Sequence, residues 1–355
     1  MRIWIDVLTP KQVLFFRGIA ERLAREGVEL LVTVRDFRET VALARALLRE
    51  FSPVIVGRYG GGDLEEKLRR SLERSLSLIR VVRDFRPSLA LSYCSPEAAR
   101  VAFGLGVEHQ AVSDIPQAEA VSRLTLPLSS RLYTPWVIPL REWVRYGIAR
   151  ERICRYRALD PIAWLRRHRF DAGVAEDLGL QPGRYIVVRT VEAYASYQLP
   201  HLREARIDLR TLVSSLLDRL PDHDVVVLER YEDRLPLTRA ELKGLERVVV
   251  PMQPVDGPSL LRYAAGFIGY GGTMTAEAAL MGVPAVSLRP GRTPHYIRFL
   301  VRAGLVRECK TSEGAVRALL RMMRDRGGLE ARAREVASAM EDPADYISEA
   351  ILGLR

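Results

Sequence analysis

Apolar and polar positions follow two different periodicities along the chain. Short runs rich in β-branched residues, such as RIWIDVL at 2–8 and VELLVTV at 28–34, predict buried strands. Between these runs, apolar residues recur three and four positions apart, as at Phe16, Ile19 and Leu23, which predicts helices. Strands that alternate with helices are typical of βαβ units, so the pattern predicts parallel sheets.

The predicted elements form two successive series. Strands are expected at 2–8, 28–34, 53–57, 88–93 and 109–114, and then at 184–190, 223–229, 247–250, 266–270, 284–288 and 305–309. Helices are expected at 12–26, 37–51, 64–85 and 96–105, and then at 209–220, 259–264, 274–281, 296–303, 313–326, 331–340 and 343–352. Residues 134–158 are less regular, and we expect them to complete the first sheet before a linker at 160–169.

The chain of 355 residues is longer than a single hydrophobic core ordinarily supports, which favours two domains. We predict one doubly wound α/β domain at 1–165, a second at 166–340, and a last helix at 341–355 that packs back on the first domain. Ligands of parallel sheets bind beyond the carboxyl ends of the strands. We therefore expect one cleft between the domains, lined by the loops that follow strands.

The composition is typical of a soluble globular protein, with 48% hydrophobic and 28% charged residues. No apolar run approaches the roughly 20 residues that cross a bilayer. The opening MRIWIDVLTP begins as a strand and not as a signal peptide, so we predict a cytoplasmic protein. Cys94, Cys154 and Cys309 lack the spacing of a metal or redox motif and are expected to be free thiols.

The net charge of +10 comes almost entirely from arginine. The arginines are scattered beside glutamates, as in LEEKLRRSLERS at 64–75, a pattern typical of solvated helix faces. The sequence has no run of five basic residues and no aromatics interleaved with arginine, which argues against a specific nucleic-acid site. Peripheral contact with a membrane remains open.

The most specific motif lies in FIGYGGTMTAEAALMGVPAVSL at 267–288. A strand is followed by a glycine turn and by a helix that Thr273 can cap. Glycine lets a ligand approach the backbone, and a helix N-terminus offers free N–H groups to an anion such as a diphosphate. Glu277 lies one turn further on, where its carboxylate can accept ribose hydroxyls. The structural alternative is a tight turn with a capping Thr273 and a surface glutamate.

The pattern G-G-T-x-x-x-E-A-x-x-x-G-x-P resembles the nucleotide-sugar motif of GT-B glycosyltransferases and UDP-N-acetylglucosamine 2-epimerases. The whole chain is similar to an archaeal family known as domain of unknown function 354, in its opening MRIWIDVLTPKQVLFF and in GGTMTAEAALMGVPAVSLRPG. This resemblance implies the GT-B fold, with two Rossmann-like domains, a cleft between them and a C-terminal helix that returns to the first domain. It also implies a nucleotide-sugar ligand.

The resemblance assigns roles to residues of the second domain. Gly271, Gly272 and Thr273 would contact the diphosphate, and Glu277 would contact the ribose. The segment RPGRTPHYIR at 289–298 resembles an arginine-rich stretch of the epimerases, and Arg189 lines up with another of their arginines. These matches add the candidates Arg289, Arg292, His295 and Arg189. His295 as a structural histidine and Arg189 as an ion-pair partner of Glu192 are the alternatives.

In the first domain, the candidates follow strands. Lys11 lies just after the first strand, at the start of a helix. One explanation is a solvated lysine, although its positive charge is unfavourable at the N-terminal end of the helix dipole. The other explanation is that Lys11 binds a phosphate or an acceptor. The epimerases place acid/base carboxylates after the fourth and fifth strands. Here Ser95 and Glu97 stand at the first of these places, and Asp114 with Glu119 at the second. Asp114 could instead cap a helix.

We predict a metal-independent GT-B glycosyltransferase that uses a nucleotide-sugar, with a UDP-sugar as substrate and no cofactor. Asp114 is the expected base, and a helix dipole with arginines can stabilise the leaving diphosphate without a metal. The partial match of the acidic residues leaves a UDP-N-acetylglucosamine 2-epimerase as the alternative. A non-catalytic nucleotide-sugar-binding protein and an electrostatic binder of nucleic acid or anionic lipid are further alternatives. The sequence identifies neither the sugar, the acceptor nor the oligomeric state.

Overall fold

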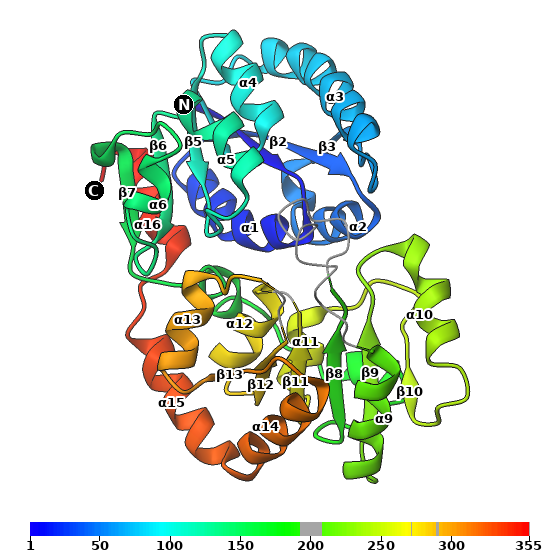
Figure 1. Ribbon diagram of the computed structural model, residues 1–355. Helices are drawn as coiled ribbons and strands as arrows, with labels where there is room; N and C mark the ends of the chain where they lie inside the picture. Colours follow the sequence, from blue (N-terminus) through cyan, green and yellow to red (C-terminus); the bar gives the residue numbers. More distant parts are fainter. Residues whose placement is uncertain (192–207, 271, 289–290, 355) are drawn as a thin grey trace. The chain divides into compact units, whose positions relative to one another are not determined.

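A computed structural model describes residues 1–191, 208–270, 272–288 and 291–354 (Figure 1). The chain divides into two compact units. The first unit comprises Met1–Arg167 and Met340–Arg355, and the second comprises His168–Ala339. In the described ranges, no helix combines the length and the apolar character needed to span a bilayer.

The first unit is built on a seven-stranded parallel sheet with the strand order β3-β2-β1-β4-β5-β6-β7. Its strands are β1 (Arg2–Val7), β2 (Glu29–Asp36), β3 (Val54–Arg58), β4 (Leu89–Ser92), β5 (Glu108–Val112), β6 (Arg131–Pro135) and β7 (Ile153–Tyr156). The parallel pairing that the alternating pattern predicts is confirmed. The strand order reverses between β1 and β4, which is the switch point at which such sheets leave room for a ligand.

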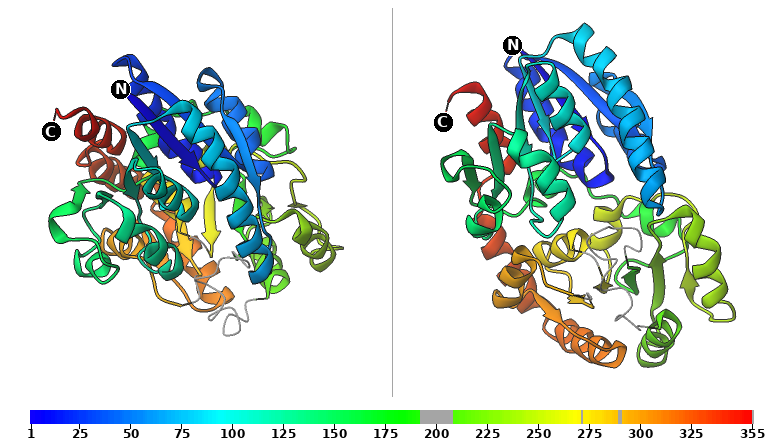
Figure 2. Two further views of the ribbon diagram at one scale, coloured as in Figure 1. Left: turned by 90° about the horizontal axis from the view of Figure 1, so that it is seen from above. Right: turned by 45° about the horizontal axis from the view of Figure 1, so that its top comes forward.

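Helices cover both faces of this sheet (Figures 1 and 2). The helices are α1 (Pro10–Arg25), α2 (Arg38–Leu47), α3 (Leu64–Phe85), α4 (Pro96–Gly104), α5 (Glu119–Thr125), α6 (Arg141–Val144), α7 (Ile162–Leu165) and α16 (Pro343–Leu352). Short 3₁₀ turns occupy η1 (Arg49–Phe51), η2 (Leu126–Leu128) and η3 (Arg150–Arg152). Helix α1 packs against α2 and α16, whereas α3 packs against α4. The last helix of the chain therefore belongs to the first unit.

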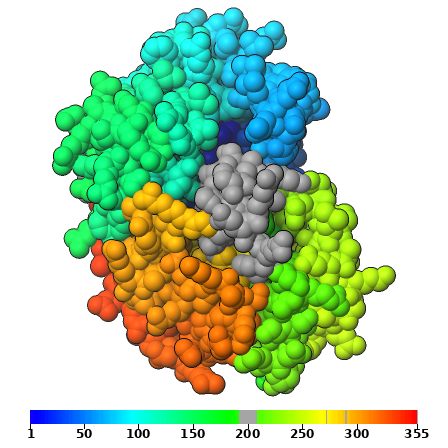
Figure 3. Space-filling model, in the orientation of Figure 1, coloured from blue at the N-terminus to red at the C-terminus, as the bar shows by residue number. Residues whose placement is uncertain are grey.

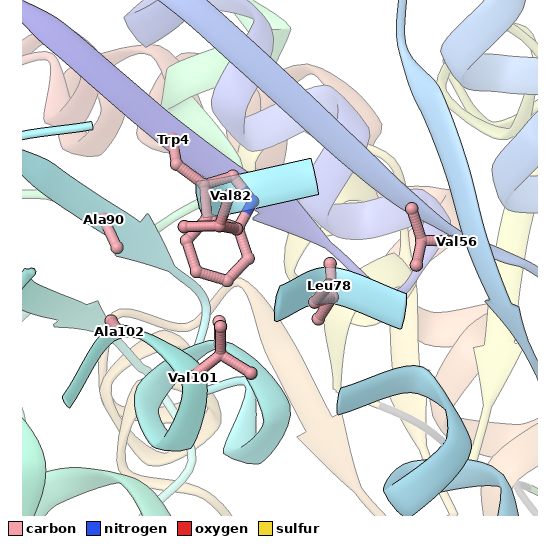
Figure 4. Close-up of a cluster of buried hydrophobic side chains, with 8 residues drawn as sticks. Trp4, Val56, Leu78, Val82, Ala90, Val101 and Ala102 are labelled. Carbon is pink, nitrogen blue, oxygen red and sulfur yellow. The ribbon is translucent and has the colours of Figure 1, made fainter. Parts of the chain in front are cut away.

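Trp4 of β1 lies at the centre of the core beneath α3 and α4 (Figure 4). Leu78 and Val82, one helical turn apart on α3, pack in the same cluster as Val101 of α4. The indole N–H of Trp4 donates a hydrogen bond to Thr33 Oγ1 at 2.7 Å, which satisfies the one polar atom of a fully buried ring.

The second unit has a six-stranded parallel sheet with the order β10-β9-β8-β11-β12-β13. Its strands are β8 (Tyr185–Arg189), β9 (Asp224–Leu228), β10 (Val248–Val249), β11 (Gly266–Gly269), β12 (Ala285–Ser287) and β13 (Val306–Glu308). Its helices are α8 (Gly173–Glu176), α9 (Leu209–Arg219), η4 (Glu232–Arg234), α10 (Leu235–Glu241), α11 (Gly257–Arg262), α12 (Thr273–Leu280), α13 (His295–Arg302), α14 (Ser312–Arg324) and α15 (Arg326–Ser338).

Candidate functional site

Charged and phenolic side chains from separate segments meet at the carboxyl ends of the first sheet. Lys11 lies in the first turn of α1, just after β1, and Tyr93 directly follows β4. Asp114 follows β5, Tyr156 ends β7, and Asp160 comes four residues later. Because β1, β4 and β5 are neighbours in the sheet, the loops that follow them come together. We call these five residues the Lys11 cluster.

The ammonium group of Lys11 has a partner for each of its three N–H bonds. Lys11 Nζ lies 2.6 Å from Asp114 Oδ2, 2.7 Å from the Tyr93 hydroxyl and 2.8 Å from Asp160 Oδ2. The ammonium also lies 4.4 Å from the centre of the Tyr93 ring. The solvated lysine that was one explanation for Lys11 is therefore wrong, since its side chain is only 17% exposed.

The two carboxylates of the cluster differ in their surroundings. Asp160 accepts hydrogen bonds from the Tyr93 hydroxyl and, at 2.7 Å, from the Tyr156 hydroxyl, in addition to its contact with Lys11. The side chain of Asp160 is 1% exposed, whereas that of Asp114 is 9% exposed. Asp160 is thus fixed as an acceptor of three hydrogen bonds, and Asp114 is the less buried of the two carboxylates.

The electrostatics suit a proton acceptor at Asp114. Burial raises the pKa of Asp114, and the negative charge of Asp160 adds to this effect, while Lys11 opposes it. Burial alone would lower the pKa of Lys11, but the two carboxylates together raise it, so the lysine remains an ammonium ion. Burial raises the pKa values of Tyr93 and Tyr156 well above the ordinary value, which keeps both phenols neutral.

The other acidic candidates lie outside this cluster. Glu97 is buried in α4, 4.0 Å from the guanidinium of Arg74, which itself forms a bidentate ion pair with Asp6. Glu119 begins α5 and is an exposed partner of Arg123 at 2.8 Å. The N-cap of α5 is Ala118, so the alternative in which Asp114 caps that helix is wrong.

Sequence reasoning missed Tyr93, Tyr156 and Asp160 as members of the site. Tyr93 is the last residue of a predicted strand, and this position was a usable signal. The next residue, Cys94, has a φ of +48°, a left-handed conformation that is uncommon outside glycine and often occurs at functional sites. Asp160 carried no such signal, because it follows β7, a strand of four residues in a stretch without clear periodicity.

In the second unit, the glycine motif lies between β11 and α12, as predicted, and Gly272 directly precedes α12. The expectation that Thr273 caps the helix is wrong, because Thr273 is its first residue and Gly272 is the N-cap. Gly272 has no side chain to satisfy the first N–H groups, and no side-chain cap bonds them among the described residues. These amides are the kind of group that binds an anion at a helix N-terminus.

Other candidates of the second unit lie around the same strand ends. Arg189, the last residue of β8, stands in register with Gly269, the last residue of β11. Glu277 of α12 is only 3% exposed, so the surface glutamate of the structural alternative is wrong. His295 begins α13, where the guanidinium of Arg298 lies 3.0 Å from its ring nitrogen Nδ1. Helix α13 packs against α12.

Arg292 is exposed in the turn before α13. Gly271, Arg289 and Glu192 lie outside the described residues.

Solved structures of several enzymes share this fold. Methanocaldococcus jannaschii UDP-GlcNAc 2-epimerase, in complex with UDP-GlcNAc and UDP, is 15% identical, with a TM-score of 0.73 over 95% of this chain and 98% of the epimerase. Spinosyn rhamnosyltransferase SpnG, complexed with spinosyn aglycone, is 17% identical, with a TM-score of 0.63 over 99% of this chain and 100% of the transferase. The similarity confirms the predicted GT-B fold.

The sequence itself has a relative across its whole length. A protein of Methanocaldococcus jannaschii, named uncharacterized protein MJ0665, is 26% identical over 360 residues, which cover 98% of this chain and 97% of that protein. The profile of one family matches residues 1–353, and the resemblance inferred from the opening segment and the glycine motif is thereby confirmed. The chain belongs to the family described as "Protein of unknown function (DUF354)".

Proposed function

We propose that this protein is a nucleotide-sugar-dependent glycosyltransferase of the GT-B type, with a UDP-sugar as donor. The observation that carries the proposal is the Lys11 cluster, in which the less buried of two carboxylates, with a raised pKa, is held by an ammonium ion. A carboxylate of this kind is suited to general base catalysis. The likeness in fold to a rhamnosyltransferase and to an epimerase that binds UDP-GlcNAc supports the class of donor.

In the proposed reaction, Asp114 removes the proton from an acceptor hydroxyl. The acceptor oxygen then forms a bond to C1 of the sugar while the bond from C1 to the diphosphate oxygen breaks. Asp114 holds the proton at the end of the step, and the nucleoside diphosphate leaves with the electron pair. Lys11 keeps Asp114 ionised before the reaction, since an adjacent positive charge favours the carboxylate.

The second unit would bind the donor. In this proposal, the uncapped N–H groups of α12 and the guanidinium of Arg189 stabilise the charge that develops on the diphosphate. Gly272 and Thr273 lie at that helix end, with Gly271 just before them, and Arg289, Arg292 and His295 would complete the anion site. Glu277 would accept the ribose hydroxyls. No step of this scheme needs a metal ion or a cofactor.

A 2-epimerase is the second candidate, and one observation favours it. Inversion at C2 of UDP-N-acetylglucosamine needs one group to remove a proton and another to return it on the opposite face. The Lys11 cluster holds two carboxylates, Asp114 and Asp160, on a single ammonium ion. Asp160 is almost fully buried and its oxygens already contact three donors, so it is less open to a sugar than Asp114, and for this reason we place transfer first.

Two assays separate these functions. A thermal-shift screen over nucleotide-sugars identifies the donor, because a ligand raises the unfolding temperature when it binds the folded state. The donor is then incubated with and without candidate acceptor alcohols, while release of UDP and inversion at C2 are followed. Release that depends on acceptor supports transfer, and inversion without acceptor supports the epimerase. If the protein binds a nucleotide-sugar but neither releases UDP nor inverts C2 under any condition, the result would support a non-catalytic nucleotide-sugar-binding protein.

A further inference from the structure

Helix α3 carries a stripe of exposed leucines. Leu64, Leu68, Leu72 and Leu76 are 68%, 62%, 59% and 67% exposed, and Ile79 adds a fifth apolar side chain at 36%. Residues four apart on a helix are neighbours on its surface. The four leucines therefore form one continuous strip, about 18 Å long at a rise of roughly 1.5 Å per residue.

The same helix buries a different face in its own unit. Leu78 and Val82 point into the core around Trp4, and Arg74 is buried against Asp6. Helix α3 thus has two apolar faces, of which the described residues cover one. Scattered exposed leucines are ordinary, but a continuous apolar strip on a soluble domain usually marks an interaction surface.

The neighbouring helix also carries exposed apolar side chains. Helix α4 packs against α3, and its Phe103 is 59% exposed. Leu105, just after α4, is 39% exposed. Figure 3 shows α3, coloured light blue, at the surface of the first unit.

The charges beside the strip are arranged so that those of one copy of the helix can pair with those of a second copy. Glu65 stands at the start of α3 and Arg83 near its end, both exposed. The two positions are five helical turns apart, at about 3.6 residues per turn, so both point in the same direction from the helix axis, toward the side of the strip. Within one copy, Arg83 lies 3.1 Å from Asp84 in an exposed ion pair, and Glu66 is paired with Arg69 and Arg70.

We infer that the leucine strip of α3 is a dimerisation surface, which packs antiparallel against α3 of a second copy of this chain. A two-fold axis at the level of position 74 brings Leu72 opposite Leu76 of the second copy. The same axis brings Glu65 level with Arg83 of the second copy, on the same side of the interface. Each ion pair then occurs twice, as in any two-fold interface.

An anionic lipid surface fits this pattern less well. Acidic side chains alternate with the basic ones along the helix, including Glu65, Glu73 and Asp84, and would be repelled by such lipids. A second copy instead presents an arginine where this copy presents a glutamate. This inference is independent of the proposed enzymatic function.

Light scattering coupled to size-exclusion chromatography tests the interface on the full chain. We expect the wild type to have twice the chain mass of 40.1 kDa. The double variant Leu72→Glu/Leu76→Glu is expected to be a monomer, because it places four carboxylates in the apolar strip. As a matched control, Leu237→Glu on α10 changes a leucine that is 63% exposed in the second unit and should leave the dimer intact. Unchanged unfolding temperatures would show that the variants fold.

Charge reversal tests the antiparallel arrangement. Glu65→Arg and Arg83→Glu should each weaken the dimer about tenfold, and the two together should restore it. A double variant no tighter than the single variants would overturn this arrangement. A monomeric wild type, or a dimer that survives Leu72→Glu/Leu76→Glu, would overturn the interface itself. Co-sedimentation of a monomeric wild type with phosphatidylglycerol vesicles, lost in that double variant, would assign the strip to a lipid surface instead.

Discussion

The hydroxyl of Tyr296 fills the space in which any side chain at position 272 would begin. A Cβ atom built on Gly272 would lie 1.8 Å from Tyr296 Oη and 2.8 Å from its Cζ. Atoms cannot approach so closely, so either the turn before α12 or helix α13 must move when position 272 carries a side chain. The requirement for glycine at this position therefore comes from Tyr296 as well as from any ligand.

We predict that Gly272→Ala weakens UDP binding at least tenfold, roughly 1.4 kcal/mol, because the displaced turn no longer presents the amides of α12. The double variant Gly272→Ala/Tyr296→Ala removes the clash and should recover most of the affinity. Calorimetric titration with UDP measures both effects. Gly327→Ala is the control, because a Cβ there meets no other atom within 4 Å. Equal affinity in Gly272→Ala and the wild type would place the nucleotide elsewhere.

The three acidic candidates of the first unit should differ sharply in their effects on turnover. Asp114→Asn is expected to lower kcat by at least a hundredfold with little change in donor binding, since general bases contribute on the order of 10²–10⁴-fold. Glu97→Gln and Glu119→Gln should keep turnover within a few-fold of the wild type, because these residues lie in other ion pairs. Initial rates of UDP release across a series of acceptor concentrations distinguish the variants. Full activity in Asp114→Asn would show that the Asp114 carboxylate takes no part in the reaction.

Removal of Lys11 should destabilise the first unit in a manner that depends on pH. Lys11→Met leaves Asp114 and Asp160 buried without their cation, and loss of one partner of a buried ion pair costs roughly 3–5 kcal/mol. The pKa of Asp114, already raised by burial, rises further in the variant. A carboxyl whose pKa is raised on folding stabilises the protein at low pH and loses this contribution as the pH rises through the raised value.

Urea unfolding of Lys11→Met at several pH values measures this effect. The difference in free energy of unfolding from the wild type should shrink as the pH falls from 8 to 5. A constant difference over this range would mean that Asp114 does not take up a proton in the variant. Lys67→Met, on α3, is a control lysine substitution away from the cluster.

Local signals in the sequence were sufficient for much of the fold. The predicted limits of α3 and α16 agree with the structure, because Asp63 and Asp342 cap these helices through hydrogen bonds to the N–H groups of Glu66 and Ala344. The short helices α5 and α10, with seven residues each, were not predicted. Two turns give too few repeats for a helical period to stand out.

The site was predictable only in part, and for a different reason. Lys11 and Asp114 were found because each follows a strand whose period is clear. Asp160 reaches Lys11 only because β7 pairs with β6, a tertiary fact that no local pattern records. The same limit explains Glu97, whose proximity to Arg74 depends on the packing of α4 beside α3.

Buried His109 is expected to make the first unit sensitive to acid. The Ser129 hydroxyl donates a hydrogen bond to the carbonyl oxygen of Thr125, so it accepts one from the Nδ1–H of His109 at 2.9 Å. The other ring nitrogen, Nε2, then accepts a hydrogen bond from the Ser92 hydroxyl at 2.9 Å. This arrangement requires the neutral ring, and burial lowers the pKa of His109 to about 4. A histidine whose pKa is lowered on folding stabilises the protein above its unfolded pKa and loses this contribution as the pH falls.

Between pH 6.5 and 4, we therefore expect the free energy of unfolding to fall by roughly 3 kcal/mol from this residue. His109→Gln should be less stable than the wild type at pH 7 and should lose less stability on acidification. The imidazole resonances of His109 in the NMR spectrum should not shift between pH 8 and 5.5. Titration of these resonances near pH 6.5 would contradict the neutral, fully bonded ring.

The backbone at Cys94 holds the loop that presents Tyr93 to Lys11, and its φ of +48° predicts an unusual effect of glycine. Outside such positions, glycine is about 1 kcal/mol less stable than alanine in ordered structure. At position 94 the order should reverse, because only glycine adopts the left-handed conformation without steric cost. Cys94→Gly is thus expected to be at least as stable as Cys94→Ala in urea unfolding. Ala98→Gly in the adjacent α4 provides the ordinary case and should cost about 1 kcal/mol. If Cys94→Gly lost stability relative to Cys94→Ala by as much as Ala98→Gly does, the left-handed backbone would carry no strain.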